Sequence, residues 1–171
     1  MHPAELARLT VETYIKTYKT PSAPEKLTGV EIKEAGAFVS IKTYDNELRG
    51  CIGTILSTED SIIKEIINNA VSAATRDPRF PAIIEEELEG LKYSVDILHP
   101  PERAFTIEEL DPKNYGIIVI SETGKQGLLL PDLEGVDTVE QQIMICQRKA
   151  GMSNSEKFYL KKFKVDRYPE E

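Results

Sequence analysis

The chain has little cysteine and little histidine. Only two of each occur among its 171 residues, and Cys51 and Cys146 stand far apart in the sequence. A framework of disulfides is therefore excluded, and the ligand spacing gives no support for a metal site. Reduced thiols are typical of the cytoplasm, which is the location that we predict. We predict no cofactor.

Long apolar runs and clusters of positive charge are also missing. No apolar stretch approaches the ~18 residues that a membrane span needs. The net charge is −8, from 21 Lys and Arg against 29 Asp and Glu. The lysines near the end, between Lys157 and Lys164, are interleaved with apolar residues as on a solvated strand edge. An acidic chain without a basic run repels phosphate groups, so we predict binding to neither nucleic acid nor a membrane.

Length and composition indicate one globular domain over residues 1–171. The chain falls within the roughly 100–200 residues of a typical domain. It is 40% hydrophobic and 29% charged, an ordinary globular balance. No internal repeat or low-complexity linker divides it.

Hydrophobic periodicity predicts an α+β fold. Helical patterns cover residues 3–19, 59–75 and 138–150, with a short acidic helix near 85–88. Alternating patterns predict strands at 37–42, 48–56 and 91–97, a hairpin of 116–121 with 126–130, and a final strand around 163–165. Asp137 and Glu140 have capping-box spacing, and Gly151 suits the C′ position. Adjacent hairpins favour a mainly antiparallel sheet with helices packed on it over a doubly wound one.

The run LRGCIG at residues 48–53 is the most informative motif. In an extended strand its side chains alternate between two faces. One face carries Leu48, Gly50 and Ile52, and the other carries Arg49, Cys51 and Gly53. The apolar set should face the core, which places the guanidinium and the thiol side by side. A cation beside a thiol favours the thiolate, and glycines in a strand often mark the close approach of a ligand or another backbone. The alternative is that Cys51 is a small buried hydrophobe and Arg49 pairs with a carboxylate.

The segment RDPRFP at residues 76–81 is a second candidate. It places Arg76, Asp77 and Arg79 in a loop that Pro78 and Pro81 stiffen. Rigid guanidinium forks suit a carboxylate or a phosphate. The alternative is an internal pair between Asp77 and an arginine that holds a helix end.

Other candidates carry less chemistry. His99 ends a predicted strand and is a base for Cys51 only if the fold brings the two together. The glycines of GKQGLLLP, residues 124–131, lack the spacing of a phosphate-binding loop, so a turn and a buried strand are expected there. Cys146 falls on the apolar stripe of a helix and is predicted to lie in the core.

The run LRGCIG, with RDPRFP, LKYSVDIL, GLLLP and KAG in order along nearly the whole chain, resembles the AMMECR domain family. That family takes its name from a human chromosomal region linked to Alport syndrome. Its prokaryotic members are called AmmeMemoRadiSam system protein A, and they are encoded beside, or fused to, a Memo-like protein and a radical SAM enzyme. The resemblance therefore implies these two proteins as partners and allows that Met1 is an excision point within a longer chain.

The resemblance also implies a fold and a set of site residues. The expected fold is an α+β domain of two unequal lobes with a cleft between them. The residues carried over are Arg49, Gly50, Cys51, Gly53, Asp77, Pro78, Arg79 and Phe80, with Gly127 and Pro131 less securely. At His99 many relatives have a small hydroxyl residue, which weakens the idea of a dyad with Cys51.

Two hypotheses follow for the function. In the first, the chain is a thiol-dependent enzyme, or a protein that binds a small anionic ligand, and it uses the LRGCIG strand. In the enzyme, Cys51 is the nucleophile or acid/base, Arg49 favours its thiolate, and Arg76 and Arg79 orient an anionic group of a small substrate. In the second, the chain is a non-enzymatic adaptor that binds the Memo-like or radical SAM protein through the LRGCIG strand and the GLLLP hairpin.

Overall fold

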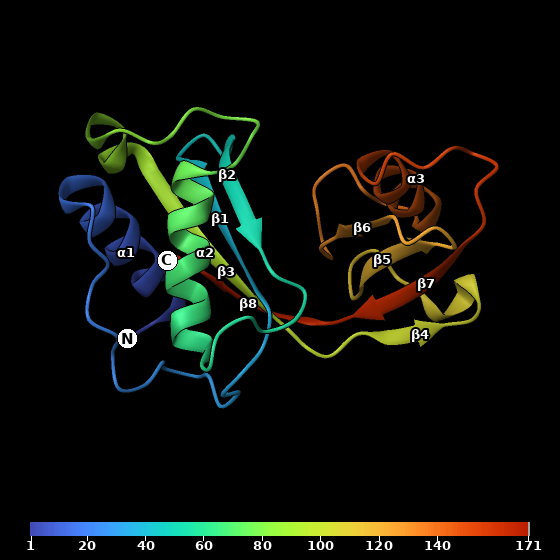
Figure 1. The fold of residues 1–171 in the computed structure, drawn as a ribbon, viewed down its shortest axis with the longest axis horizontal. Helices are drawn as coiled ribbons and strands as arrows, with labels where there is room; N and C mark the ends of the chain where they lie inside the picture. Colours follow the sequence, from blue (N-terminus) through green and yellow to red (C-terminus); the bar gives the residue numbers. More distant parts are fainter. Residues whose placement is uncertain (171) are drawn as a thin grey trace. The chain divides into compact units, whose positions relative to one another are not determined.

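The computed structural model describes residues 1–170 and divides into two compact units (Figure 1). The first runs from Met1 to Leu98 and takes in the C-terminal segment from Asp166; the second is His99–Val165. The first contains α1 (Pro3–Thr17), β1 (Ala37–Thr43), β2 (Leu48–Gly53), α2 (Ile62–Thr75), the 3₁₀ helix η1 (Glu85–Gly90), β3 (Leu91–Leu98) and most of β8 (Val165–Pro169). The second contains β4 (Glu102–Ala104), the 3₁₀ helix η2 (Ile107–Glu109), β5 (Gly116–Ser121), β6 (Gln126–Leu129), α3 (Val139–Lys149) and β7 (Phe158–Phe163).

The first unit is built on a four-stranded sheet in the order β2-β1-β3-β8. β1 pairs antiparallel with both β2 and β3, which confirms the predicted hairpin of the first two strands. Ala37, Val39 and Ile41 are fully buried, while the residues between them are partly exposed. Because successive side chains of a strand point to opposite faces, β1 presents an apolar face and a polar face. β2 lies at the edge of this sheet.

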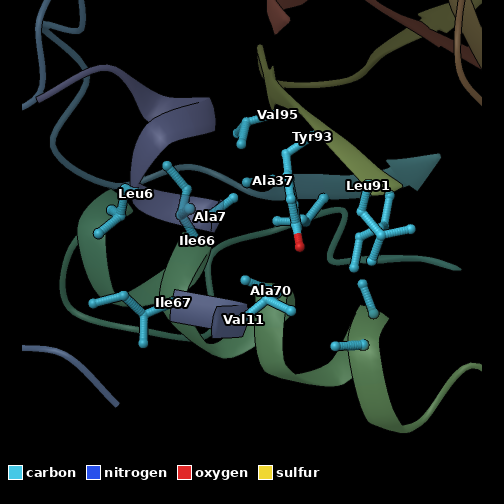
Figure 2. Close-up of a cluster of buried hydrophobic side chains, with 14 of the residues drawn as sticks. Leu6, Ala7, Val11, Ala37, Ile66, Ile67, Ala70, Leu91, Tyr93 and Val95 are labelled. Atoms are coloured by element: carbon cyan, nitrogen blue, oxygen red, sulfur yellow. The ribbon is translucent and has the colours of Figure 1, made fainter. Parts of the chain in front are cut away.

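The helices α1 and α2 pack on the apolar face, as Figure 2 shows for one cluster of buried side chains. This cluster includes Leu6, Ala7, Val11, Ala37, Ile66, Ile67, Ala70, Leu91, Tyr93 and Val95. α2 begins at Ile62 rather than at residue 59, because Ser61 is its N-cap and accepts a hydrogen bond from the backbone of Lys64. It ends at Thr75, before Pro78, as predicted. No helix within residues 1–170 combines the length and apolar character that crossing a membrane requires.

Glu65 fixes the loop that joins β2 to α2. Its side chain is buried, with a relative exposure of 1%, and its carboxylate accepts hydrogen bonds from the backbone N–H groups of Thr58 and Glu59. The Thr54 hydroxyl donates a further bond at 2.5 Å. A buried carboxylate is tolerated where such donors satisfy it, so this loop is held firmly to α2.

The second unit has its own four-stranded antiparallel sheet, in the order β4-β7-β5-β6, with α3 packed on one face. The predicted hairpin of β5 and β6 is confirmed. A Cβ atom at Gly127 would lie 2.1 Å from the carbonyl oxygen of Cys146, so this glycine allows α3 to approach the sheet closely. Cys146 is fully buried, as predicted.

Three local predictions need correction. The N-cap of α3 is Thr138, in a capping box with Gln141, rather than Asp137 with Glu140; Gly151 does follow the helix with a positive φ of 66°. The end of the chain forms two strands, β7 and β8, in different sheets, instead of one strand. β7 lies between β4 and β5, so its lysines are not on a sheet edge. The mainly antiparallel α+β class is confirmed, but the strands form two sheets.

Candidate functional site

The alternation of β2 is as the sequence predicts. A Cβ atom at Gly50 would lie 2.3 Å from the carbonyl oxygen of Ala73, so Gly50 faces α2. Ile52 packs against the same core. Arg49 and Cys51 therefore project from the opposite face of the sheet. Leu48, although it shares the inner face by alternation, is 36% exposed.

Ser40 lies across the strands from Cys51. The two residues are directly opposite in β1 and β2. The N–H of Cys51 points away from β1, to Asp77, so this is a non-hydrogen-bonded pair, in which side chains approach most closely. The Ser40 Oγ lies 3.2 Å from the Cys51 Sγ. Cys51 is reduced, and as a residue it is partly exposed, whereas Cys146 is buried.

Asp77 joins the RDPRFP segment to the edge of β2. Its carboxylate accepts a hydrogen bond from the Cys51 N–H at 2.9 Å and is only 2% exposed. It also accepts bonds from Arg79, through the backbone N–H at 3.1 Å, Nε at 3.0 Å and Nη2 at 2.7 Å. Hydrogen bonding from the Arg79 guanidinium lowers the pKa of Asp77 to about 2. The internal pair between Asp77 and an arginine is therefore present, and it fixes the loop against Cys51.

Arg79 contacts the backbone of Cys51. Its Nη2 donates to the Cys51 carbonyl oxygen at 3.5 Å. Its pKa is raised, mainly by the hydrogen bond to Asp77 and further by the charge of Cys51. The side chain remains 55% exposed. Arg79 therefore contacts the cysteine and has open surface on which a ligand can bind.

Arg49 forms a compact ion pair on the same face. Its Nε and Nη2 donate to the two carboxylate oxygens of Glu87 at 2.7 Å and 2.9 Å, and its Nη1 donates to the Pro81 carbonyl oxygen at 2.9 Å. The fork lowers the pKa of Glu87, which therefore stays ionised. The charge of Arg49 is compensated by this bidentate pair.

The remaining predicted residues surround this arrangement. The Phe80 ring lies 5.9 Å from the Arg49 guanidinium carbon and 5.5 Å from that of Arg79. Arg76 is the exposed C-cap of α2, and its side chain forms no hydrogen bond or ion pair in the part of the chain that the structure describes. A Cβ atom at Gly53 would lie 2.2 Å from the Phe38 ring, so the lack of a side chain there accommodates a neighbouring aromatic.

Other candidate residues belong to the second unit. His99 donates its backbone N–H to the Lys164 carbonyl oxygen. Gly127 packs against α3, and Pro131 is buried. Sequence reasoning missed Ser40 and Glu87. The alternation of β1 placed Ser40 on a polar face, but no local signal gave its register with Cys51 or the distant partner of Arg49.

The fold and the site together define a class of protein. It is an antiparallel α+β protein in which one sheet face carries a thiol, a hydroxyl and two arginine–carboxylate pairs. The family model described as AMMECR1 matches residues 4–171, and the chain belongs to this family. A Thermotoga maritima protein is 46% identical over 163 residues, covering 92% of this chain and 91% of that protein.

Further relatives place the domain in proteins of different lengths. A Clostridium acetobutylicum protein is 44% identical over 168 residues; the alignment covers 97% of this chain but 35% of that protein. The crystal structure of an uncharacterized protein from Pyrococcus horikoshii is similar with a TM-score of 0.87 at 29% identity, covering 99% of this chain and 90% of the other.

Proposed function

We propose that the chain is a thiol-dependent enzyme in which the Cys51 thiolate attacks a small substrate or modified side chain that carries an anionic group. The observation that supports this most is the surroundings of the partly exposed Cys51: its Sγ lies 3.2 Å from the Ser40 Oγ, and its backbone carbonyl oxygen accepts a hydrogen bond from the Arg79 guanidinium. A nearby cation favours the thiolate, and a hydroxyl donor stabilises it. The predicted reaction class is acyl transfer or related amide chemistry.

The cation assigned to the thiol in this proposal is Arg79 rather than Arg49. Both guanidinium groups pair with the two oxygens of a carboxylate, Arg49 with Glu87 and Arg79 with Asp77. Arg79 differs in that it also reaches the backbone of Cys51 and stays more than half exposed, whereas the Arg49 side chain is 13% exposed. Arg49 then has a positioning role, because its fork holds η1 beside the RDPRFP segment. Arg76, which is exposed and unpaired within residues 1–170, is the further guanidinium proposed for the anionic group of the substrate.

Alkylation of the native protein by iodoacetamide across pH tests the proposal. Burial raises the pKa of Cys146 to about 12, so labelling below pH 9 reports on Cys51. We expect the rate to reach half its maximum below the ~8.5 of an ordinary thiol. A Cys51→Ser variant gives the background from Cys146. A midpoint at or above that of a small free thiol would overturn the proposal.

A non-enzymatic adaptor is the second candidate, and the edge position of β2 favours it. An edge strand presents backbone groups to which an extended segment of another protein can add. At Cys51 the outward N–H and carbonyl oxygen already bond to Asp77 and Arg79, so a segment that adds there must displace these two side chains. The family resemblance points to a Memo-like protein and a radical SAM protein as the partners in this proposal. Co-precipitation of each purified partner with wild type, Cys51→Ala and Arg79→Ala separates the two candidates. Equal recovery with all three chains would count against an adaptor that uses this strand.

A further inference from the structure

The sheet of the second unit has a face opposite α3 with a different character. Ile117, Val119 and Leu160 point toward α3 and belong to the core of that unit. By alternation, Arg103, Tyr159 and Lys161 project from the other face. Arg103 is exposed, and the other two are partly exposed. We call this set of residues, together with Phe105, the Arg103 face.

Two aromatic rings lie against the Arg103 guanidinium. Its carbon lies 4.1 Å from the centroid of the Tyr159 ring and 5.6 Å from that of Phe105. Phe105 is 80% exposed. Stacking against a ring fixes the plane of a guanidinium and leaves its N–H edge available, so Arg103 is oriented for a planar anion such as a carboxylate.

Arg103 and Lys161 are two like charges in direct opposition. They are cross-strand partners in the pairing of β4 with β7. Neither side chain forms an ion pair or a hydrogen bond among the described residues. Like charges directly opposite in a sheet destabilise it. An anion bound between them would attract both, so that the pair then stabilises the sheet.

A pair of lysines in the first sheet offers a comparison. Lys42 is directly opposite Lys92 in β1 and β3. Lys92, however, donates a hydrogen bond to the Asn46 side chain, and no aromatic ring lies against either lysine among the described residues. The Arg103 face therefore differs in having an uncompensated, ring-stacked guanidinium.

We infer that the Arg103 face is a docking surface for an acidic segment of a partner protein, with Arg103 and Lys161 clamping one carboxylate and Phe105 packing on an apolar residue beside it. Arginine and aromatic residues carry much of the binding energy of protein interfaces. A nucleic acid is disfavoured as the occupant, because a polyanion needs a track of cations and the whole chain has a net charge of −8. The inference is independent of Cys51 and of the function proposed above.

Fluorescence anisotropy with defined probes tests this inference. The probes are a labelled peptide in which Glu alternates with Leu and Tyr, the same peptide with Gln for Glu, and an oligouridine. We expect the wild type to bind the Glu peptide best. Arg103→Ala and Lys161→Gln should each weaken that binding roughly tenfold or more, and Arg103→Lys should fail to restore it, since lysine lacks the planar fork. Lys42→Gln, in the other sheet, is the matched control and should bind as the wild type does.

Four results would overturn the inference. They are equal binding of the Glu and Gln peptides, unchanged binding by Arg103→Ala, tighter binding of the oligouridine than of the Glu peptide, and lack of any binding to the Glu peptide. A melting curve for each variant separates lost contacts from lost folding, and Lys161→Glu provides a second check. It should abolish peptide binding while raising the melting temperature, because it places an anion opposite Arg103.

Discussion

The carboxylate of Asp77 accepts a hydrogen bond from the backbone N–H of Cys51 at 2.9 Å. A loop that follows α2 is thereby attached to the edge strand that carries the thiol. The same carboxylate accepts three bonds from Arg79, so one buried side chain sets the position of both the cysteine and the cation beside it.

Asp77→Ala should therefore lower the free energy of unfolding. It removes the acceptor for the Cys51 N–H and for the Arg79 fork, and a donor left unsatisfied in a buried position costs about 1–3 kcal/mol. Chemical denaturation at pH 7 measures the loss. Asp77→Asn keeps one acceptor oxygen, so its loss should be smaller; a larger loss than that of the alanine variant would contradict this account.

The same carboxylate predicts an acid-dependent loss of stability. The pKa of Asp77 is about 2 in the folded chain, below its ordinary value of 3.8. Its stabilising contribution is thus complete above pH 4 and is lost as the pH falls from about 4 to 2. Denaturation curves at several pH values should show this decline, which Asp77→Asn should reduce. An equal slope in both proteins would show that other carboxylates cause it.

Gly50→Ala should destabilise the first unit. The added methyl group would lie 2.3 Å from the Ala73 carbonyl oxygen, so β2 and α2 must separate, at a cost of about 1–3 kcal/mol. Gly90→Ala is the matched control, because a Cβ atom there meets no heavy atom within 4 Å. Thermal unfolding of the two variants tests the difference. Similar melting temperatures would mean that α2 adjusts to the methyl group without loss.

Part of this site follows from the sequence, and part depends on contacts between distant segments. A strand has a period of two, so the side of β2 on which Cys51 lies could be predicted from Gly50 and Ile52 alone. The distance to Ser40 depends on the register of β1 with β2, which shifts between Ile41 and Lys42. Register follows from tertiary packing, so local periodicity does not give it.

The sequence could not identify the partner of Arg49, for a similar reason. The acidic segment near residues 85–88 offers several carboxylates with the same local pattern, and only the three-dimensional path of η1 selects Glu87. The predicted N-cap of α3 lies one residue before the observed one. Asp137–Glu140 and Thr138–Gln141 have the same spacing, and the chain uses the second pair as its capping box.

Tyr93→Phe should leave the chain as stable as the wild type or slightly more stable. Tyr93 is 2% exposed, and its hydroxyl, directed from β3 toward the helices, has no hydrogen-bond partner among the described residues (Figure 2). Removing an unsatisfied buried hydroxyl removes its desolvation cost. Tyr168→Phe is the comparison, since that hydroxyl donates to the Gly29 carbonyl oxygen at 3.1 Å. A lower melting temperature for Tyr93→Phe than for Tyr168→Phe would contradict the prediction.

The two arginines beside the thiol should respond differently to substitution. Arg79→Ala removes the guanidinium that contacts Cys51, so the pH midpoint of iodoacetamide labelling should rise by about 1 pH unit. Arg49→Ala removes the fork onto Glu87, so it should lower the melting temperature and move the midpoint much less. Arg79→Lys keeps the positive charge and should restore most of the wild-type midpoint.

The pattern across these variants separates an electrostatic role from a structural one. A residue that only stabilises the loop changes the melting temperature without changing the pH at which the thiol reacts. A residue whose charge favours the thiolate changes that pH, and a second cation at the same position restores it. If Arg49→Ala moves the midpoint more than Arg79→Ala does, the guanidinium that favours the thiolate is the one paired with Glu87, and the roles proposed for the two arginines must be exchanged.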